Sequence, residues 1–320
     1  MDILQEILNA ERRTEPHLLV TPLLYSHYLS DLCDGEVYLK MESEQYTGSF
    51  KARGAINKLT WLLERKQASK TIITASTGNH GLGVARALNS LKMEGRIVVP
   101  ENADENKVDA LQQFGAEIEV YGKDCFESEI YAREKARKED MVYVSPYNDP
   151  QVIGGQGTIG TEISRQLGYP IDNVLVTIGG GGLISGIGTY FKAVNPNIRV
   201  LGCQPKNSPE MTLSVRSGSY QTVEQQETLS DASAGPFEQD SITYPLCKEL
   251  VDDFFLATEQ QIASAIHLVL KRERKLIEGA AAVAVACFLK NIDRFREQTS
   301  VIVICGGNIS EKNLRKVICS

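Results

Sequence analysis

Four consecutive glycines, Gly179, Gly180, Gly181 and Gly182, stand between the apolar run NVLVTI and the amphipathic run LISGIGTYFKAV. This order predicts a strand, a glycine loop and a helix. A helix N-terminus presents free backbone N–H groups and a partial positive charge, and glycines let an anion approach both closely. The run therefore predicts a phosphate-binding loop, with a tight turn that needs only glycine's conformational freedom as the alternative.

The glycine loop matches neither of the common nucleotide-binding patterns. The dinucleotide pattern G-x-G-x-x-G requires a last glycine where this chain has Ile184 or Ser185, and its ribose-binding acid would fall near Gln204. The P-loop requires Lys followed by Ser or Thr, and no such pair follows. The phosphate is therefore predicted to belong to neither NAD nor ATP.

Lys51 stands in TGSFKARGA, at the start of the helical run INKLTWLLER. The positive end of a helix destabilises an ammonium group, which favours the neutral amine that Schiff-base chemistry requires. A solvated surface lysine is the alternative.

The segment ASTGNHG, residues 75–81, separates the predicted strand TIITA from a helical run. Its hydroxyl, amide and backbone donors predict a carboxylate site at a helix N-terminus, with plain helix capping as the alternative. A phosphate loop, an activated lysine and a carboxylate loop are together what an enzyme requires that uses pyridoxal 5'-phosphate (PLP) on an amino acid.

Alternating strands and helices must position these motifs. Apolar, β-branched runs predict strands at 71–75, 96–99, 117–120, 141–144, 173–178, 198–202, 252–257 and 301–305, with helices between most of them. Strands that are apolar throughout and alternate with helices predict mainly parallel sheets covered on both faces. We expect two open α/β lobes, with ligands in the cleft between them.

Two other segments carry predictions about structure. Residues 280–289 are apolar but much shorter than the ~18 residues of a membrane span, so they predict a buried helix. Residues 204–245 are rich in Ser, Gln, Glu and Pro, which predicts a partly irregular excursion over the surface.

Charge and cysteine usage exclude several classes of protein. The net charge of −7 over 320 residues excludes binding to nucleic acid or to a membrane surface through overall charge. The N-terminus has no basic start followed by an apolar stretch, so no secretory signal is expected. Reduced thiols and a cytoplasmic location are predicted, because the seven cysteines are widely spaced, odd in number and free of C-x-x-C: Cys33, Cys125, Cys203, Cys247, Cys287, Cys305 and Cys319.

The motifs SFKARGA, STGNHG, GGGGL and CGGN occur in one order between Thr21-Pro22 and Asn308. In this they resemble the serine/threonine dehydratase and serine racemase group of fold-type II PLP enzymes. The phrase LSDASAG, residues 229–235, looks closest to a bacterial branch with phenylserine and ectoine-pathway dehydratases. The resemblance implies a tryptophan synthase β-like fold and a homodimer. It implies a large domain of residues 1–69 and 149–320 and a small domain of residues 70–148.

The resemblance also implies roles for single residues. Lys51 would form the Schiff base and act as base at the substrate Cα, Phe50 would pack on the pyridine ring, and Asn79 would bond its hydroxyl. The glycine loop would bind the phosphate. The substrate carboxylate would be held by Ser76, Thr77, Gly78, Asn79 and His80, with help from Gln156.

Cys305 would face the ring nitrogen of the cofactor. A neutral thiol there, unlike a carboxylate, leaves the ring less able to stabilise a long-lived carbanion, which favours rapid loss of a β-substituent. The alternative for Cys305 is a small buried apolar residue.

The implied reaction is dehydration and deamination of a β-hydroxy amino acid such as L-serine or L-threonine, giving a 2-oxo acid and ammonia. The alternatives are a racemase, a β-replacement synthase, a 3-hydroxyaspartate dehydratase, or an inactive binding protein with the same fold. Thr77 stands where the racemase has the serine that acts opposite its lysine. No regulatory extension follows, so isoleucine feedback is not expected.

Two departures bear on activators. In the racemase a divalent cation, Mg or Ca, is bound by a Glu after the strand that matches 198–202, with further ligands beyond it. Here those positions are Gln204, Ser208 and Glu210, and a neutral amide weakens such a site. Leu82 replaces the racemase's ATP-binding Gln, which argues against activation by ATP.

Overall fold

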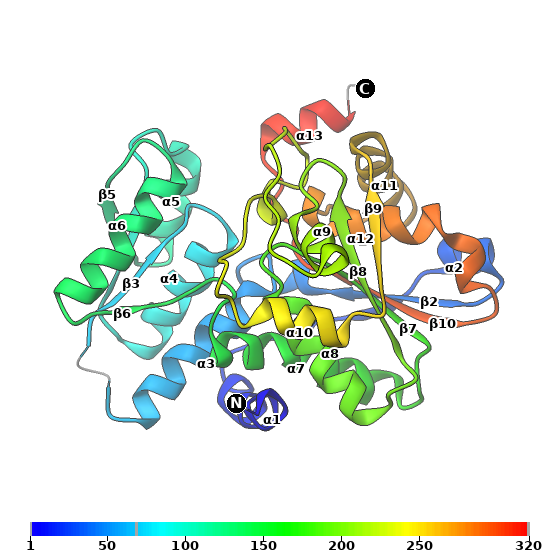
Figure 1. Cartoon of the computed structure of the whole chain (residues 1–320), viewed down its shortest axis with the longest axis horizontal. Coiled ribbons are helices and arrows are strands. Elements are labelled where there is room, and N and C mark those ends of the chain that lie inside the picture. Colours follow the sequence, from blue (N-terminus) through cyan, green and yellow to red (C-terminus); the bar gives the residue numbers. More distant parts are fainter. Residues whose placement is uncertain (1, 68–69, 319–320) are drawn as a thin grey trace.

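The computed structural model describes residues 2–67 and 70–318, and it contains two β-sheets with helices on both faces of each (Figure 1). Cys319 and the residue at the end of the predicted domain segment 1–69 lie outside the described residues. Within the described ranges no helix is both long and apolar enough to cross a membrane. The predicted α/β architecture with mainly parallel sheets is confirmed.

The larger sheet has six strands in the order β1-β2-β10-β7-β8-β9. Only the β1–β2 pair is antiparallel. All five residues of β7 are buried, as expected for a central parallel strand. The strands are β1 (Leu23–Tyr25), β2 (Glu36–Met41), β7 (Asn173–Thr177), β8 (Arg199–Pro205), β9 (Asp253–Ala257) and β10 (Thr299–Ile304).

The smaller sheet has four parallel strands in the order β5-β4-β3-β6. All four fall inside 70–148, the range predicted for the small domain, although the domain boundaries themselves stay a prediction. The strands are β3 (Ile72–Ala75), β4 (Gly95–Val99), β5 (Glu117–Val120) and β6 (Val142–Tyr143).

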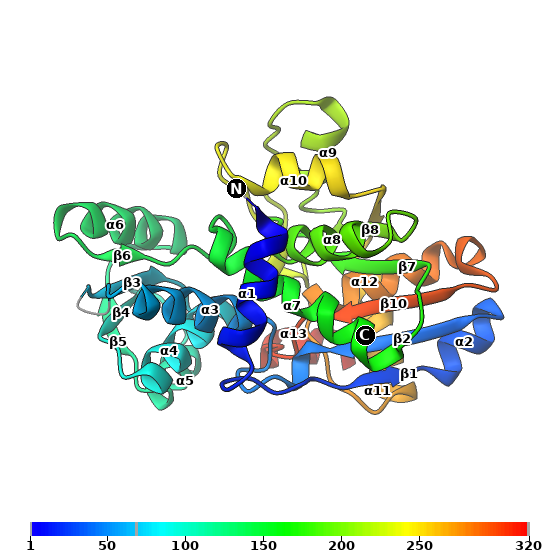
Figure 2. The ribbon, with the colours of Figure 1, turned by 90° about the horizontal axis from the view of Figure 1, so that it is seen from below.

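Helices cover both faces of each sheet. Around the larger sheet, α8 packs on one face and α12 on the other (Figure 2). Around the smaller sheet, α4 and α5 share an apolar cluster with β4, while α6 packs on the opposite face. The helices are α1 (Ile3–Thr14), α2 (His27–Cys33), α3 (Lys51–Glu64), α4 (Asn79–Leu91), α5 (Glu105–Gln113), α6 (Cys125–Lys138), α7 (Pro150–Leu167), α8 (Gly182–Val194), α9 (Glu210–Ser217), α10 (Thr243–Leu250), α11 (Glu259–Arg272), α12 (Gly279–Lys290) and α13 (Glu311–Ile318), with short 3₁₀ turns η1 (Glu42–Glu44), η2 (Asp231–Ser233) and η3 (Ile292–Phe295).

Local sequence explains where several helices begin. Asp149 accepts hydrogen bonds from the backbone N–H groups of Gln151 and Val152, and Pro150 follows it at the first helical position of α7. Thr258 opens α11 with a complete capping box. The apolar segment 280–289 forms most of α12, whose first ten residues are buried, so the predicted buried helix is confirmed.

All eight predicted strands are present, with ends that differ from the predicted ones by at most three residues. β1 and β2 were missed, because β1 has three residues and β2 carries Glu36 and Lys40. The excursion 204–245 also contains α9 and the start of α10, while residues 218–242 have no regular element besides η2.

Candidate active site

The sequence motifs lie at the two points where the strand order reverses. In the larger sheet the chain proceeds outward from β7 to β9 and then returns to place β10 on the other side of β7. In the smaller sheet β3 has β4 on one side and β6 on the other. The glycine loop follows β7, Cys305 follows β10, and Ser76 follows β3. These positions are where doubly wound sheets bind ligands.

A cavity of about 1250 Å³ joins the two switch points. It is large enough for a cofactor together with a small substrate. Of the residues predicted to act there, those that line it are Phe50, Lys51, Ser76, Thr77, Gly78, Asn79, His80, Gly179, Gly180, Gly181, Gly182 and Cys305.

Lys51 is the first residue of α3, as predicted, and lies half-buried in this cavity. Its Nζ donates a hydrogen bond to the carbonyl oxygen of Pro146 at 2.8 Å. Burial lowers the pKa of the amine to about 8, although the nearby Glu278 carboxyl acts in the opposite direction. Burial thus supplies a cause of amine activation that helix position alone did not reveal.

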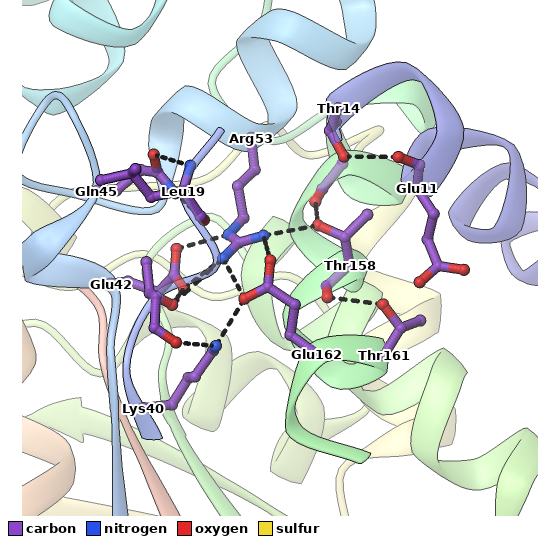
Figure 3. Close-up of polar contacts among 12 residues, drawn as sticks. Glu11, Thr14, Leu19, Lys40, Glu42, Gln45, Arg53, Thr158, Thr161 and Glu162 are labelled. Atoms are coloured by element: carbon purple, nitrogen blue, oxygen red, sulfur yellow. Dashed lines mark hydrogen bonds and ion pairs between the residues drawn. The ribbon is translucent and has the colours of Figure 1, made fainter. Parts of the chain in front are cut away.

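Arg53 anchors the first turn of α3 to the larger lobe (Figure 3). Its buried guanidinium donates to both carboxylate oxygens of Glu42 at 2.7 and 2.8 Å, and to both of Glu162 at 2.7 and 2.9 Å. Lys40 also donates to Glu162, so two cations and two carboxylates meet. Because planar bidentate pairs fix orientation as well as distance, this cluster holds the backbone beside Lys51 in one place.

The glycine loop leads into the N-terminus of α8 and lines the cavity. Gly181 has a φ of +87°, which favours glycine, and no side chain is available there to cap the helix. A Cβ on Gly180 would lie 2.3 Å from Cδ1 of Tyr147, so the wall of the cavity excludes a side chain there as well. The loop therefore fits the phosphate of PLP.

Asn79 is oriented by two partners, one of which the sequence motifs did not reveal. Its Nδ2 donates to the carboxyl oxygens of Glu278 at 2.9 and 3.1 Å, and its Oδ1 accepts from Nδ2 of Asn308 at 2.7 Å. Burial raises the pKa of the Glu278 carboxyl to about 7, against the hydrogen bond from Asn79. Glu278 lines the cavity, but its charged context, RERKLIEG, carries no sequence signal for a buried acid.

Two predicted carboxylate ligands have side chains engaged elsewhere. Nε2 of His80 lies 3.0 Å from the Thr74 hydroxyl and 2.9 Å from the carbonyl oxygen of Val144. Burial, together with the Lys51 charge, lowers the pKa of His80 to about 3, so the imidazole is neutral. Gln156 lies on α7 outside the cavity lining, where its Oε1 accepts from the backbone N–H of Gly54 at 3.2 Å.

Cys305 is buried at the end of β10 and lines the cavity. Burial raises the pKa of its thiol well above the ordinary value, so the thiol stays protonated and neutral. Its carbonyl oxygen accepts a hydrogen bond from the backbone N–H of Phe50 at 3.0 Å, which joins the strand end to the lysine motif. A neutral group at this position is what the sequence prediction requires.

The three residues of the predicted cation site gather away from the cavity, at the end of β8 and the start of α9. Ser208 donates to Glu210, and Gln204 Oε1 accepts from Thr212. Among residues 2–67 and 70–318, no three or more His, Cys, Asp or Glu side chains are grouped so that they could hold a metal ion.

Comparison with known proteins gives one consistent result. The profile of the family described as "Pyridoxal-phosphate dependent enzyme" matches residues 14–306. The chain is 37% identical over 316 residues to the catabolic L-threonine dehydratase of Escherichia coli (strain K12), which covers 98% of this chain and 95% of that protein. The solved structure of the processed form of threonine deaminase isoform 2 from Solanum lycopersicum superposes with a TM-score of 0.92 at 34% identity, covering 98% of this chain and 92% of that one. Maize serine racemase superposes with a TM-score of 0.90 at 29% identity, covering 98% and 96%.

Proposed function

Because this chain belongs to the family of pyridoxal-phosphate dependent enzymes, we propose that it is an ammonia-lyase that acts on a β-hydroxy amino acid, with L-threonine and L-serine as the first candidates. The products are a 2-oxo acid and ammonia. The observation that carries the proposal is the convergence of a Lys51 amine with a lowered pKa, a carboxylate loop and a glycine loop on one cavity.

Different residues of the cavity would hold the cofactor and the amino-acid substrate. Gly179, Gly180, Gly181 and Gly182 would bind the phosphate through backbone N–H groups, and Phe50 would pack against the ring. Asn79, held in place by Glu278 and Asn308, would hydrogen-bond the cofactor ring. Ser76, Thr77 and Gly78 receive the substrate carboxylate through hydroxyl and backbone donors, and His80 contributes through its backbone.

The cofactor, when bound, withdraws electrons from the substrate Cα and so makes its proton acidic. Lys51 would take this proton, because its pKa of about 8 lets the neutral amine exist near neutral pH. The β-hydroxyl leaves with a proton as water, and hydrolysis of the resulting enamine releases ammonia and the 2-oxo acid. Cys305 stays neutral throughout, which favours elimination over transamination.

Substitution of Lys51 tests the proposal directly. The wild-type protein is expected to bind PLP with visible absorbance and to form oxo acid from L-threonine or L-serine. Lys51→Ala should lose that absorbance and at least about 10²-fold in kcat, since it removes both the covalent link and the base. Lys248→Ala, on the exposed surface of α10, serves as the matched control. Oxo-acid formation by Lys51→Ala at the wild-type rate would refute the assignment.

The substrate is resolved by assaying L-serine, L-threonine, 3-hydroxyaspartate and phenylserine side by side. Formation of oxo acid chiefly from 3-hydroxyaspartate would select the alternative dehydratase. A protein that binds PLP but turns over none of these substrates would support the inactive binding protein instead.

A racemase remains the second candidate function, because the Thr77 side chain lines the cavity and the fold is similar to that of maize serine racemase. Racemisation needs a second proton donor across from Lys51, and the Thr77 hydroxyl would serve. Chiral analysis of product formed from L-serine decides the matter. D-serine that appears faster than pyruvate would make racemisation the main reaction, and Thr77→Val should then abolish it.

We further propose that the protein is cytoplasmic and forms a homodimer. Six cysteines of the described chain are free, which supports a reducing compartment: Cys33, Cys125, Cys203, Cys247, Cys287 and Cys305. Val20, shortly before the edge strand β1, and Tyr25, the last residue of that strand, are exposed, and a second copy of the chain would cover them. Sedimentation velocity of the holoenzyme tests the dimer, and a single monomeric species at micromolar concentration would contradict it.

A further inference from the structure

A buried polar cluster lies at the end of β8, outside the cavity. Five side chains form it, and we call them the Glu210 cluster: Gln204, Ser208, Glu210, Thr212 and Gln225. Gln204 and Glu210 are each 1% exposed, and Ser208 and Thr212 are fully buried, whereas Gln225 is exposed and covers Glu210 from the solvent side. The proposed chemistry uses none of these side chains. A buried carboxylate needs compensating partners, so what supplies them is informative.

Each carboxylate oxygen of Glu210 already has a neutral donor. Oε1 accepts from Nε2 of Gln225 at 2.6 Å, and Oε2 accepts from Oγ of Ser208 at 2.7 Å. The side-chain oxygen Oε1 of Gln204 accepts two hydrogen bonds from Thr212, one from its backbone N–H at 2.8 Å and one from its Oγ1 at 2.7 Å. Both carboxylate oxygens of Glu210 and the side-chain oxygen of Gln204 therefore already accept hydrogen bonds from protein donors.

This arrangement does not fit the divalent cation that the resemblance to serine racemase implies. Ca²⁺ takes about six to eight oxygen ligands, and Mg²⁺ about six in an octahedron. A cation would have to displace both Thr212 donors from Gln204 and the Gln225 amide from Glu210. It would gain one carboxylate in return, since Gln204 and Ser208 are neutral.

The donors also connect the cluster to the substrate cavity. Gln225 belongs to the loop of residues 218–242, and the backbone N–H of Gly235 in the same loop donates to Ser208 Oγ at 3.0 Å. Between these two tethers lies η2, whose Asp231 and Ser233 line the cavity. The loop is closely seated, because a Cβ on Gly179 would lie 3.2 Å from Cα of Ser233.

We propose that Gln225 takes the place of a divalent cation at Glu210, so that hydrogen bonds and no metal ion tie the 218–242 loop to Glu210, and the enzyme works independently of Mg²⁺ or Ca²⁺. Gln225 is thereby a positioning residue that acts through Glu210 and η2. The part of this proposal that concerns turnover rests on the proposed deaminase function, whereas the part that concerns cation binding does not.

The first experiment uses the wild-type holoenzyme. After treatment with EDTA, thermal unfolding is followed with and without millimolar MgCl₂ or CaCl₂, at constant ionic strength. Tm and kcat/KM are expected to stay unchanged. A bound cation at about 100 times its Kd would raise Tm by about 5 °C. A rise of this size, or loss of activity in EDTA that either cation restores, would overturn the proposal.

The second experiment installs the missing carboxylate. Gln204→Glu is expected to lower Tm in EDTA, because two carboxylates then face each other in a buried site. Millimolar Mg²⁺ or Ca²⁺ should restore the Tm of this variant. Gln260→Glu, on the exposed first turn of α11, adds the same charge as a control and should show no cation response. A folded Gln204→Glu protein whose Tm ignores both cations would also overturn the proposal.

The third experiment removes the tether. Gln225→Met keeps the length of the side chain but loses the donor to Glu210. Because Gln225 is exposed and water can replace part of this hydrogen bond, Tm should fall by about 2–4 °C. If Gln225 positions η2, KM for the amino acid should rise by more than kcat falls. A change in Tm with KM unaltered would show a structural role only and would refute the positioning role. If no substrate is turned over at all, the proposed function fails, while the cation measurements still decide this inference.

Discussion

Glu278 is a buried carboxyl group whose hydrogen bonds come from neutral donors, the side-chain amide of Asn79 and the backbone N–H of Asn308. Burial raises its pKa from 4.5 to about 7 in the folded protein. Between these values the folded state holds a proton that the unfolded state has lost. The free energy of unfolding contributed by this group therefore falls by about 3 kcal/mol as pH rises from 4.5 through 7.

Substituting Glu278 with glutamine should remove this pH dependence. We expect the stability of Glu278→Gln relative to the wild type to rise by about 3 kcal/mol between pH 4 and pH 8, measured by urea unfolding of the cofactor-free proteins. Glu249→Gln, on the exposed face of α10, is the control and should keep the wild-type slope. A constant difference between the two proteins across this range would mean that Glu278 titrates normally.

Gly181 and Gly168 both have positive φ, at +87° and +72°, but their surroundings differ. A Cβ on Gly181 would lie 2.9 Å from Sγ of Cys247 and 3.0 Å from Cβ of Thr243, whereas nothing lies within 4 Å at Gly168. Gly168→Ala should cost about 1 kcal/mol through backbone strain alone. Gly181→Ala should cost clearly more and should also weaken PLP binding, measured by fluorescence titration. Equal losses of unfolding free energy in the two variants would show that the glycine loop shifts to accept a side chain without further cost.

The elements around Lys51 are joined by charges as well as by apolar contacts. α3 shares an apolar cluster with β3 and α4 through Ile56 and Leu59, yet its first turn is tied by Arg53 to η1 and α7 of the larger lobe. α3 therefore contacts both lobes, the smaller one through apolar side chains and the larger one through Arg53. A buried ion pair of this kind is weak evidence for stability, because desolvation offsets much of the attraction. The ion pairs of Arg53 instead fix the orientation of the first turn of α3.

Removal of Arg53 from the cluster that it forms with Lys40, Glu42 and Glu162, here called the Arg53 cluster, should lower stability although the intact cluster adds little. Arg53→Met leaves two buried carboxylates short of a partner and should lower the free energy of unfolding by about 3–5 kcal/mol. Arg12→Met, which breaks an exposed pair with Glu64, should cost about 1 kcal/mol or less. Urea unfolding of both variants measures the contrast. Similar costs would show that water reaches the Arg53 cluster.

At the scale of the whole molecule, an ion pair spans the two lobes beside the cavity. Arg133 on α6 contacts Glu238 of the larger lobe at 2.7 Å. The backbone N–H of Glu238 donates to the Tyr147 hydroxyl at 2.8 Å, and Tyr147 packs on the glycine loop. The pair therefore links the position of the smaller lobe to the wall of the cavity.

Breaking this link should affect substrate binding more than folding. Arg133→Gln should raise KM by up to about fivefold, since partly exposed pairs contribute about 1 kcal/mol or less. Added salt should raise the wild-type KM toward that of the variant, because it screens the pair. Arg296→Gln, which breaks exposed pairs within the larger lobe, is the control. A wild-type KM that is insensitive to salt would contradict the role of this contact.

The sequence by itself determined the motifs, their order and nearly all of the sheet framework. Gly181, Lys51 and the β7 strand are recognisable because the physics that places them is local: a glycine run before a helix, a helix start and an unbroken apolar run. β2 escaped detection because Lys40 interrupts its apolar pattern. The charge of that buried lysine is compensated by Glu162, which lies 122 positions further along the chain.

Only the tertiary structure decided which groups meet and how burial changes them. Glu278 reaches Asn79 across 199 positions, and Gln225 reaches Glu210 through an irregular loop. The lowered pKa of Lys51 and the raised pKa of Glu278 both arise from loss of water, a property of the packed cavity and of no sequence window. Spacing along the chain identifies candidate groups, but desolvation and long-range contacts set their chemistry.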